Sequence, residues 1–259
     1  MGLLLGLISC GDQPKNEAQQ KQTQDTVEKS NALSHLKANE YTLKFDSKIC
    51  SEQLCELIQI QSLKTADPWL NQQIEHSLAK VIQDQLNQPE SLNLKQASEK
   101  YLNESKKWVN EFALNQPYEL NIHTKIPSQE NQFALIQMIV NSKQAEVTVK
   151  DRGYFVVYDR KMQRKVNIGD VIQENQINDF QRILNTAYRK WLKQQPSDVK
   201  ALSPAALDWK NAEWFFDHEG IGLHYRANEL VKGGDQLDIF LNQKQTKQIL
   251  KKEIYQKMF

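Results

Sequence analysis

The residues best suited to acid–base or metal chemistry stand side by side at Asp217, His218 and Glu219. They fall between two apolar segments, which predicts that they form the turn of a β-hairpin. Three consecutive side chains in a turn rarely converge on one ion, so we expect no metal site. Adjacent turn residues are also poorly placed to act as the facing carboxylates of a glycosidase. We assign Asp217 and Glu219 to ligand binding, where they would attract a cationic partner.

Trp209 is a second candidate for ligand contact. It lies between Asp208 and Lys210, near the end of a short expected helix. An aromatic ring with polar neighbours can stack on a sugar or anchor a protein interface. The alternative is that Trp209 closes the edge of the sheet as part of the core. The sequence carries no GxSxG, HExxH, Walker or GxGxxG motif, so we predict no cofactor and no enzymatic activity.

The first ten residues resemble a lipoprotein signal peptide. Leu7, Ile8 and Ser9 precede Cys10 at the end of a short apolar run, as in the bacterial lipobox, where the cysteine is freed by cleavage and lipidated. The run is too short to span a membrane by itself. No Lys or Arg precedes it, which leaves the true start codon open. The alternative is an apolar N-terminus with an incidental cysteine.

Residues 11–39 are rich in Gln, Lys, Glu, Asn, Thr and Ser, with almost no large apolar side chain. Such a segment buries too little surface to offset its ordering entropy, so we expect a disordered tether with a reach of about 30 Å. Lipid on Cys10 would hold the folded part near the membrane, facing the periplasm. Asp12 stands one place later than in the inner-membrane retention signal, so we expect the outer membrane.

Cys50 and Cys55 are the remaining cysteines. A periplasmic location favours a disulfide between them, and the short loop suits disulfide geometry. A redox-active or metal-binding pair is the alternative. However, four residues separate these cysteines, instead of the two of a CxxC motif, and no second pair accompanies them. We therefore expect a structural disulfide.

Composition limits the partners and the number of domains. Lys and Arg number 33 against 32 Asp and Glu, for a formal net charge of +1. This balance lacks the basic excess of nucleic-acid-binding proteins, so we expect no nucleic-acid partner. Residues 40–259 suit one domain, or two packed subdomains at 40–115 and 116–259.

Apolar residues that recur every three or four positions predict three long helices. Asp67 and Pro68 begin the first helix as its N-cap and first helical residue, and Pro89 ends it. The same spacing assigns Phe112 and Ile177 to the buried faces of the other two. These two helices are expected over about 94–114 and 176–195.

Alternating apolar and polar residues predict strands elsewhere. Residues 133–140 are apolar on both faces and should form a central strand. Residues 213–216 and 221–225 flank the Asp217 turn, and a last strand follows at 237–241. His224 is expected on the face opposite its apolar neighbours. Strands in hairpin order, with helices inserted in blocks, predict an α+β fold whose antiparallel sheet has helices on one side.

Segments of the C-terminal half resemble one domain family. They are similar to the family that includes the extracellular domain of the lysozyme-sensing anti-sigma factor RsiV and the accessory domain of the peptidoglycan deacetylase PdaC. Together with the region from Cys50 to Leu86, the resemblance covers nearly the whole folded part, through hydrophobic patterns and not catalytic signatures. The segments that carry it are 154–159, 166–172 and 215–225, followed by Glu229, Leu230, Gly234 and 237–239.

The resemblance implies a binding role. Residues 231–233 depart from the family, which often has a Pro-Tyr pair there, and the sequence shows neither the transmembrane helix of RsiV nor the catalytic domain of the deacetylase. We therefore expect a lipid-anchored envelope protein that recognises lysozyme or a peptidoglycan-related ligand through loops 159–163 and 217–220. A wall-active enzyme and a structural envelope lipoprotein are the alternatives.

Overall fold

The computed structural model describes residues 33–45, 55–87, 91–210 and 212–259. Cys10 and most of the expected tether lie outside the described residues, so the signal peptide and lipidation stay predictions. Cys55 is disulfide-bonded, whereas Cys50 lies outside the described residues, and their pairing stays a prediction. No helix in the described ranges is long and apolar enough to cross a membrane.

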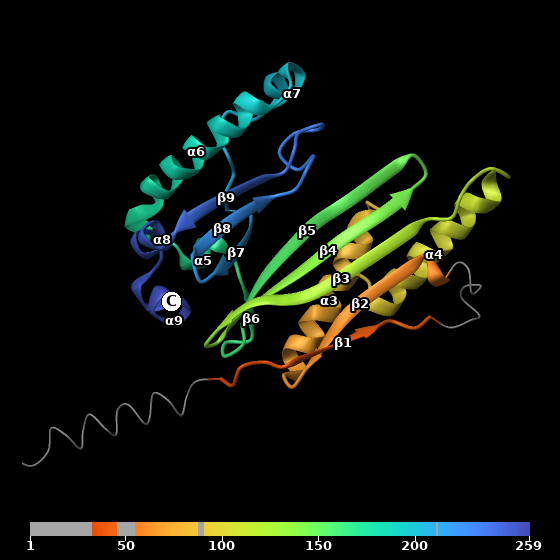
Figure 1. Ribbon diagram of the computed structural model, residues 1–259, viewed down its shortest axis with the longest axis horizontal. Helices are drawn as coiled ribbons and strands as arrows, with labels where there is room; N and C mark the ends of the chain where they lie inside the picture. Colours follow the sequence, from red (N-terminus) through yellow and green to blue (C-terminus); the bar gives the residue numbers. More distant parts are fainter. Residues whose placement is uncertain (1–32, 46–54, 88–90, 211) are drawn as a thin grey trace, which may run out of the picture. The chain divides into compact units, whose positions relative to one another are not determined.

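A six-stranded sheet runs in the order β1–β2–β3–β4–β5–β6 (Figure 1). Neighbouring strands are antiparallel except β2 and β3, which are parallel. A parallel pair requires a long crossover connection, and two helices, α3 and α4, make it. The strands are β1 (Ala38–Thr42), β2 (Ile58–Thr65), β3 (Glu119–Glu130), β4 (Phe133–Gln144), β5 (Val147–Asp159) and β6 (Arg164–Val166).

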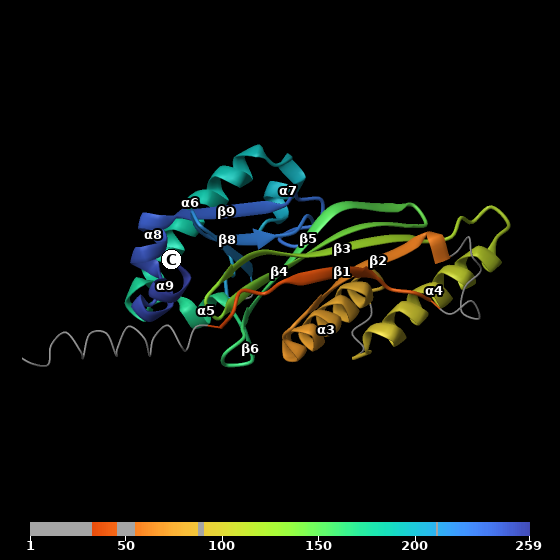
Figure 2. The ribbon, with the colours of Figure 1, turned by 60° about the horizontal axis from the view of Figure 1, so that its bottom comes forward.

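Helices α3 (Pro68–Gln85) and α4 (Leu94–Glu111) cover one face of this sheet (Figure 2). The predicted start of α3 is confirmed, because the Asp67 side chain accepts a hydrogen bond from the Leu70 amide at 3.0 Å. Apolar residues at helical spacing then bury one stripe of α3 against the sheet. These residues, Leu70, Ile74, Leu78 and Ile82, are fully buried.

A second sheet contains β7 (Glu213–Asp217), β8 (Gly220–Tyr225) and β9 (Leu237–Asn242), all antiparallel. Its apolar face packs in one core with α6 (Ile177–Gln194). The shorter helical segments are α5 (Ile168–Val171), η1 (Glu174–Gln176), α7 (Ser197–Leu202), α8 (Gln243–Ile249) and α9 (Lys252–Met258).

Strands β4 and β5 contribute to two hydrophobic cores, because successive residues of a strand point to opposite faces. Ile136 and Tyr158 join the core beneath α3 and α4. Leu135 and Val157 join the core around α6 and the second sheet. The described chain from His35 onward therefore forms one compact unit, with helices on the outer side of each sheet (Figure 2).

The α+β class is confirmed, and so is the central position of β4. The expected single antiparallel sheet is in fact two sheets, with one parallel pair. The burial predicted for two helix residues is wrong: Phe112 is 62% exposed because α4 ends at Glu111, and Ile177 is 38% exposed at the first position of α6.

The folded part begins within the segment expected to be a tether. Leu36 is buried, and its backbone N–H and C=O both bond to the Gln129 side chain, at 2.8 and 3.0 Å. Strand β1 then begins at Ala38. The segment left for a tether is therefore shorter than residues 11–39.

Candidate functional site

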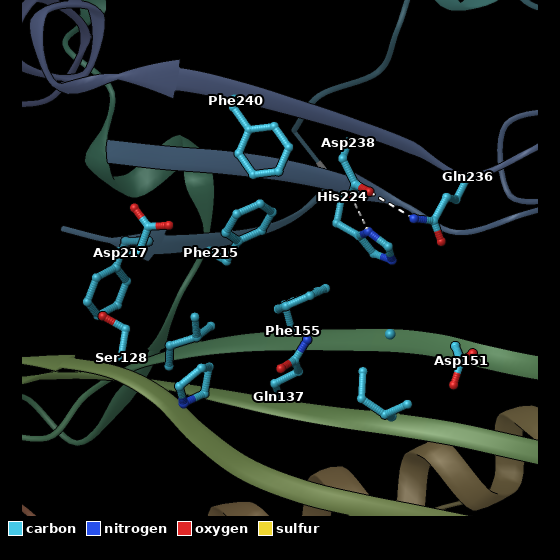
Figure 3. A pocket seen from close by; sticks show the side chains of 15 residues that line it. Ser128, Gln137, Asp151, Phe155, Phe215, Asp217, His224, Gln236, Asp238 and Phe240 are labelled. Carbon is cyan, nitrogen blue, oxygen red and sulfur yellow. Dashed lines mark hydrogen bonds and ion pairs between the residues drawn. The ribbon is translucent and has the colours of Figure 1, made fainter. Parts of the chain in front are cut away.

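The two sheets turn their helix-free faces toward each other and line an open groove of about 340 Å³ (Figure 3). Leu135, Gln137 and Ile139 of β4 alternate with residues that pack under α3 and α4, so they point into the groove. Phe215 and Asp217 alternate in the same way with the buried Trp214 and Phe216 of β7. Further lining residues are Ser128, Asp151, Gly153, Phe155, His224, Gln236, Asp238 and Phe240.

The strand register arranges the groove face of the second sheet into rows. Phe215, Gly222 and Phe240 form one cross-strand row, and Glu213, His224 and Asp238 form the next. Side chains in such a row are close enough to interact. The first row is therefore aromatic and the second is ionisable.

Three phenylalanines form an aromatic wall. The ring centroids of Phe155 and Phe215 lie 5.1 Å apart, and those of Phe215 and Phe240 lie 5.4 Å apart. A Cβ atom on Gly222 would come within 2.1 Å of the Phe215 ring, so this ring lies directly over the glycine. Phe240 is 66% exposed. An exposed apolar surface of this kind can stack on the apolar face of a ligand.

His224 and Asp238 form a hydrogen-bonded pair, with 2.6 Å between Nδ1 and Oδ1. Gln236 donates from Nε2 to the other carboxylate oxygen at 2.9 Å. The imidazole is buried, lies edge-on to Phe155 and turns Nε2 toward Gly153. A carboxylate accepts hydrogen bonds, so Nδ1 of His224 donates to Asp238. The contacts of the ring with Asp238 and Phe155 together fix its orientation.

A second cavity of about 190 Å³ meets the groove at Gly153, His224 and Gln236, which line both. Cations line this cavity: Lys150 is exposed, and Arg152 and Arg226 are half-buried. Its lining includes no carboxylate. The groove therefore has an aromatic part and an end of mixed charge, where Asp151 lines the groove and Lys150 and Arg152 line the adjoining cavity.

Glu213 and Arg226 connect the two sheets near this end of the groove. Arg226 donates to Glu213 at 2.5 Å and to Glu229 at 2.8 Å, and its guanidinium lies 4.4 Å from the centre of the Tyr154 ring. Glu213 also accepts a hydrogen bond from the Phe155 backbone amide of β5 at 2.9 Å. Burial raises the pKa of Glu213, although the positive charge of Arg226 acts in the opposite direction.

Of the two carboxylates predicted to bind ligand, one reaches the groove. Asp217 lines the groove, but its Oδ1 also accepts hydrogen bonds from the backbone amides of Glu219 and Gly220, at 2.8 and 3.2 Å. The side chain of Glu219 is 80% exposed on the turn, 3.8 Å from His218. No group of three potential ligands in the described part could hold a metal ion.

Trp209 does not lie in the groove. It is only 6% exposed and packs edge-on against Phe180 of α6, with ring centroids 5.1 Å apart. The prediction that it contacts ligand is therefore wrong, because the core around α6 encloses the ring. The alternative interpretation, a structural tryptophan, agrees with this position.

In loop 159–163 the charged side chains of Asp159 and Arg160 are buried, whereas that of Lys161 is exposed. Asp159 accepts the backbone amides of Lys161 and Met162, both at 3.0 Å. The Arg160 side chain is 5% exposed and binds Asp67 at 3.1 Å. These contacts give Asp159 and Arg160 a structural role in the turn.

No motif in the sequence predicts the residues that dominate the groove, which are Phe155, Phe215, Phe240, His224 and Asp238. A signal was present in β9, where Asp238 and Phe240 alternate with buried Leu237, Ile239 and Leu241. A large aromatic residue on the polar side of a strand indicates a surface that binds a ligand or a partner.

No protein-family model and no curated protein matches this chain. The crystal structure of a DUF3298 family protein from Pseudomonas aeruginosa PAO1 is similar, with a TM-score of 0.61 and 16% sequence identity, over 86% of this chain and 97% of that one. The crystal structure of a DUF3298 family member from Bacteroides fragilis NCTC 9343 is also similar, with a TM-score of 0.55 and 10% sequence identity, over 88% of this chain and 98% of that one. The chain has the fold of these proteins, which agrees with the fold that the RsiV/PdaC resemblance implies. Membership of that family stays a prediction.

Proposed function

We propose that this chain is a lipid-anchored protein of the cell envelope whose groove binds a peptidoglycan-related glycan. The observation that carries the proposal is the wall of Phe155, Phe215 and Phe240, placed beside the hydrogen-bonding groups of Gln137 and Asp238. Sugar rings present an apolar face and a rim of hydroxyl groups, and a groove with both kinds of surface complements them.

The basic residues of the adjoining cavity favour an acidic glycan over a neutral one, although Asp151 lines the groove at the same end. Peptidoglycan carries carboxylates on its peptide groups, and Lys150 and Arg152 would attract them. Lipidation at Cys10 would place this groove in the periplasm, most simply on the outer membrane. The function is binding and not catalysis in this proposal, since Asp217 and Glu219 serve the turn and the surface.

The test is calorimetric titration of the full chain carrying C10S with muropeptide fragments and with neutral chitooligosaccharides. Muropeptides should bind saturably and more tightly than the neutral sugars. The F240A variant should lose about tenfold or more in affinity, because the ring is the exposed part of the wall. F112A is the matched control, since Phe112 is exposed to a similar extent outside the groove. Absence of muropeptide binding, or equal loss in both variants, would refute the proposal.

A second candidate partner is a lysozyme-type protein bound at the β7–β8 turn. The observation that favours it is the projecting, 80% exposed side chain of Glu219 on a turn that Asp217 holds in shape. Lysozymes are cationic, so E219K should weaken the complex through charge repulsion, whereas E75K on the distant face of α3 should not. Titration with c-type lysozyme distinguishes the candidates: unchanged affinity in E219K and F240A alike would exclude this turn and the groove as its site.

A further inference from the structure

Two residues of β9 combine the elements of a sugar-binding subsite. Asp238 and Phe240 are two positions apart, so their side chains point to the same face of the strand. The spacing of such a pair is about 7 Å, close to the width of a sugar ring. The Asp238 side chain is 29% exposed and Phe240 is 66% exposed. Figure 3 shows both on the groove side of the second sheet.

The Asp238 carboxylate is held in place but not saturated. An ionised carboxylate offers about four acceptor positions. His224 Nδ1 and Gln236 Nε2 occupy one position on each oxygen, at 2.6 and 2.9 Å. The remaining acceptor positions belong to a partly exposed group that lines the groove. A ligand with hydroxyl or amide N–H donors is the chemical complement of such a group.

The surroundings of His224 explain why the carboxylate does not rotate. The imidazole is 4% exposed, packs edge-on against Phe155 and contacts the position where a Gly153 side chain would begin. It therefore cannot follow a moving carboxylate. A fixed acceptor loses less conformational entropy when a ligand binds, which increases affinity.

We propose that Asp238 accepts hydrogen bonds from hydroxyl or N–H groups of a sugar ring whose apolar face stacks on Phe240, with His224 and Gln236 as positioning residues. This inference rests on the proposed glycan function and adds the subsite and the type of ligand group. The neighbouring Phe215 ring, 5.4 Å from Phe240, extends the stacking surface along the groove.

The experiment measures muropeptide affinity by calorimetry in the full C10S chain and its D238N variant. D238N keeps the shape but removes the charge of the acceptor, so affinity should fall about tenfold or more. D198N is the control, because Asp198 is an exposed carboxylate on α7. It should bind as tightly as the parent chain. Thermal unfolding of each variant shows whether the fold is retained.

The positioning role has its own pair of variants. In H224N the side-chain amide can still donate to Asp238, as Nδ1 of the imidazole does, whereas H224F removes the donor. H224N should therefore bind close to the parent level and H224F several-fold more weakly. Equal affinities in H224N and H224F would overturn the positioning role.

The outcomes separate the subsite from the proposed function. Loss of affinity in F240A but not in D238N would overturn the subsite and leave glycan binding in place. No muropeptide binding by the parent chain would overturn both. Loss in D238N and F240A, with D198N unchanged, is the expected result.

Discussion

At the scale of single residues, the missing side chain of Gly222 determines where the Phe215 ring lies. A Cβ atom there would come within 2.1 to 2.6 Å of three ring atoms. We expect G222A to push the ring out of the aromatic wall, to lower muropeptide affinity several-fold and to cost about 1–3 kcal/mol of stability through overpacking. G169A is the control, because a Cβ on Gly169 would meet nothing within 4 Å. Calorimetry and urea unfolding of both variants check this, and an unaffected G222A would mean that the ring moves freely.

Single-residue roles could be predicted only where they depend on local pattern. Alternation placed His224 on the correct face of its strand, but its burial depends on Phe155 and Gly153 of the other sheet. For Trp209 the local pattern was misleading: its polar sequence neighbours predict an exposed ring, whereas Phe180 of α6 covers it. Contacts between distant segments decided both cases, and no periodicity in the sequence encodes them.

At the scale of elements, Asp67 has two functions that substitutions can separate. It caps α3 through Leu70 and pairs with the buried Arg160 at 3.1 Å. D67N keeps an oxygen for the cap but loses the charge, whereas D67A loses both. We expect D67A to be less stable than D67N by about 1 kcal/mol, the contribution of an N-cap. Urea unfolding measures both, and equal stability would show that the cap contributes nothing.

The elements themselves were the most predictable part of the fold. Asp67 and Pro68 located the start of α3, because capping is a local interaction. The end of α4 was placed too late, since helical spacing continues to Phe112 although the chain turns extended there. The parallel pairing of β2 and β3 was also missed, because it depends on where the α3–α4 crossover returns the chain.

At the scale of the whole molecule, the groove exists because two sheets face each other, and local patterns predicted only one sheet. Besides the aromatic contacts of Phe155, the two sheets are joined through Glu213, which accepts a hydrogen bond from the Phe155 amide of β5 and pairs with Arg226. A charged residue on a strand is ordinarily read as a solvent-facing side chain. Its role as a connection became apparent only from the arrangement of the two sheets.

This connection should make stability depend on pH in a defined direction. Burial raises the pKa of Glu213 in the folded protein, so the protonated form favours folding. That contribution is complete below the ordinary carboxyl pKa and is lost as the pH rises through the raised value. The free energy of unfolding of the parent chain should therefore fall, relative to E213Q, as the pH rises above the ordinary carboxyl pKa. Urea unfolding over a pH series measures the difference, with E219Q, at an exposed turn position, as the control.

If the free energy of unfolding of the parent chain rises with pH relative to E213Q, Arg226 stabilises the Glu213 carboxylate by more than burial destabilises it.

Glycan affinity is an independent test of the contact between Glu213 and β5. The glutamine side chain can still accept a hydrogen bond from the Phe155 amide, so E213Q retains the hydrogen bond that joins β5 to β7. The groove should then keep its width, and muropeptide affinity in E213Q should stay near the parent value at neutral pH. A large loss of affinity would mean that the charge of Glu213, and not its hydrogen bond to β5, keeps the two sheets in register.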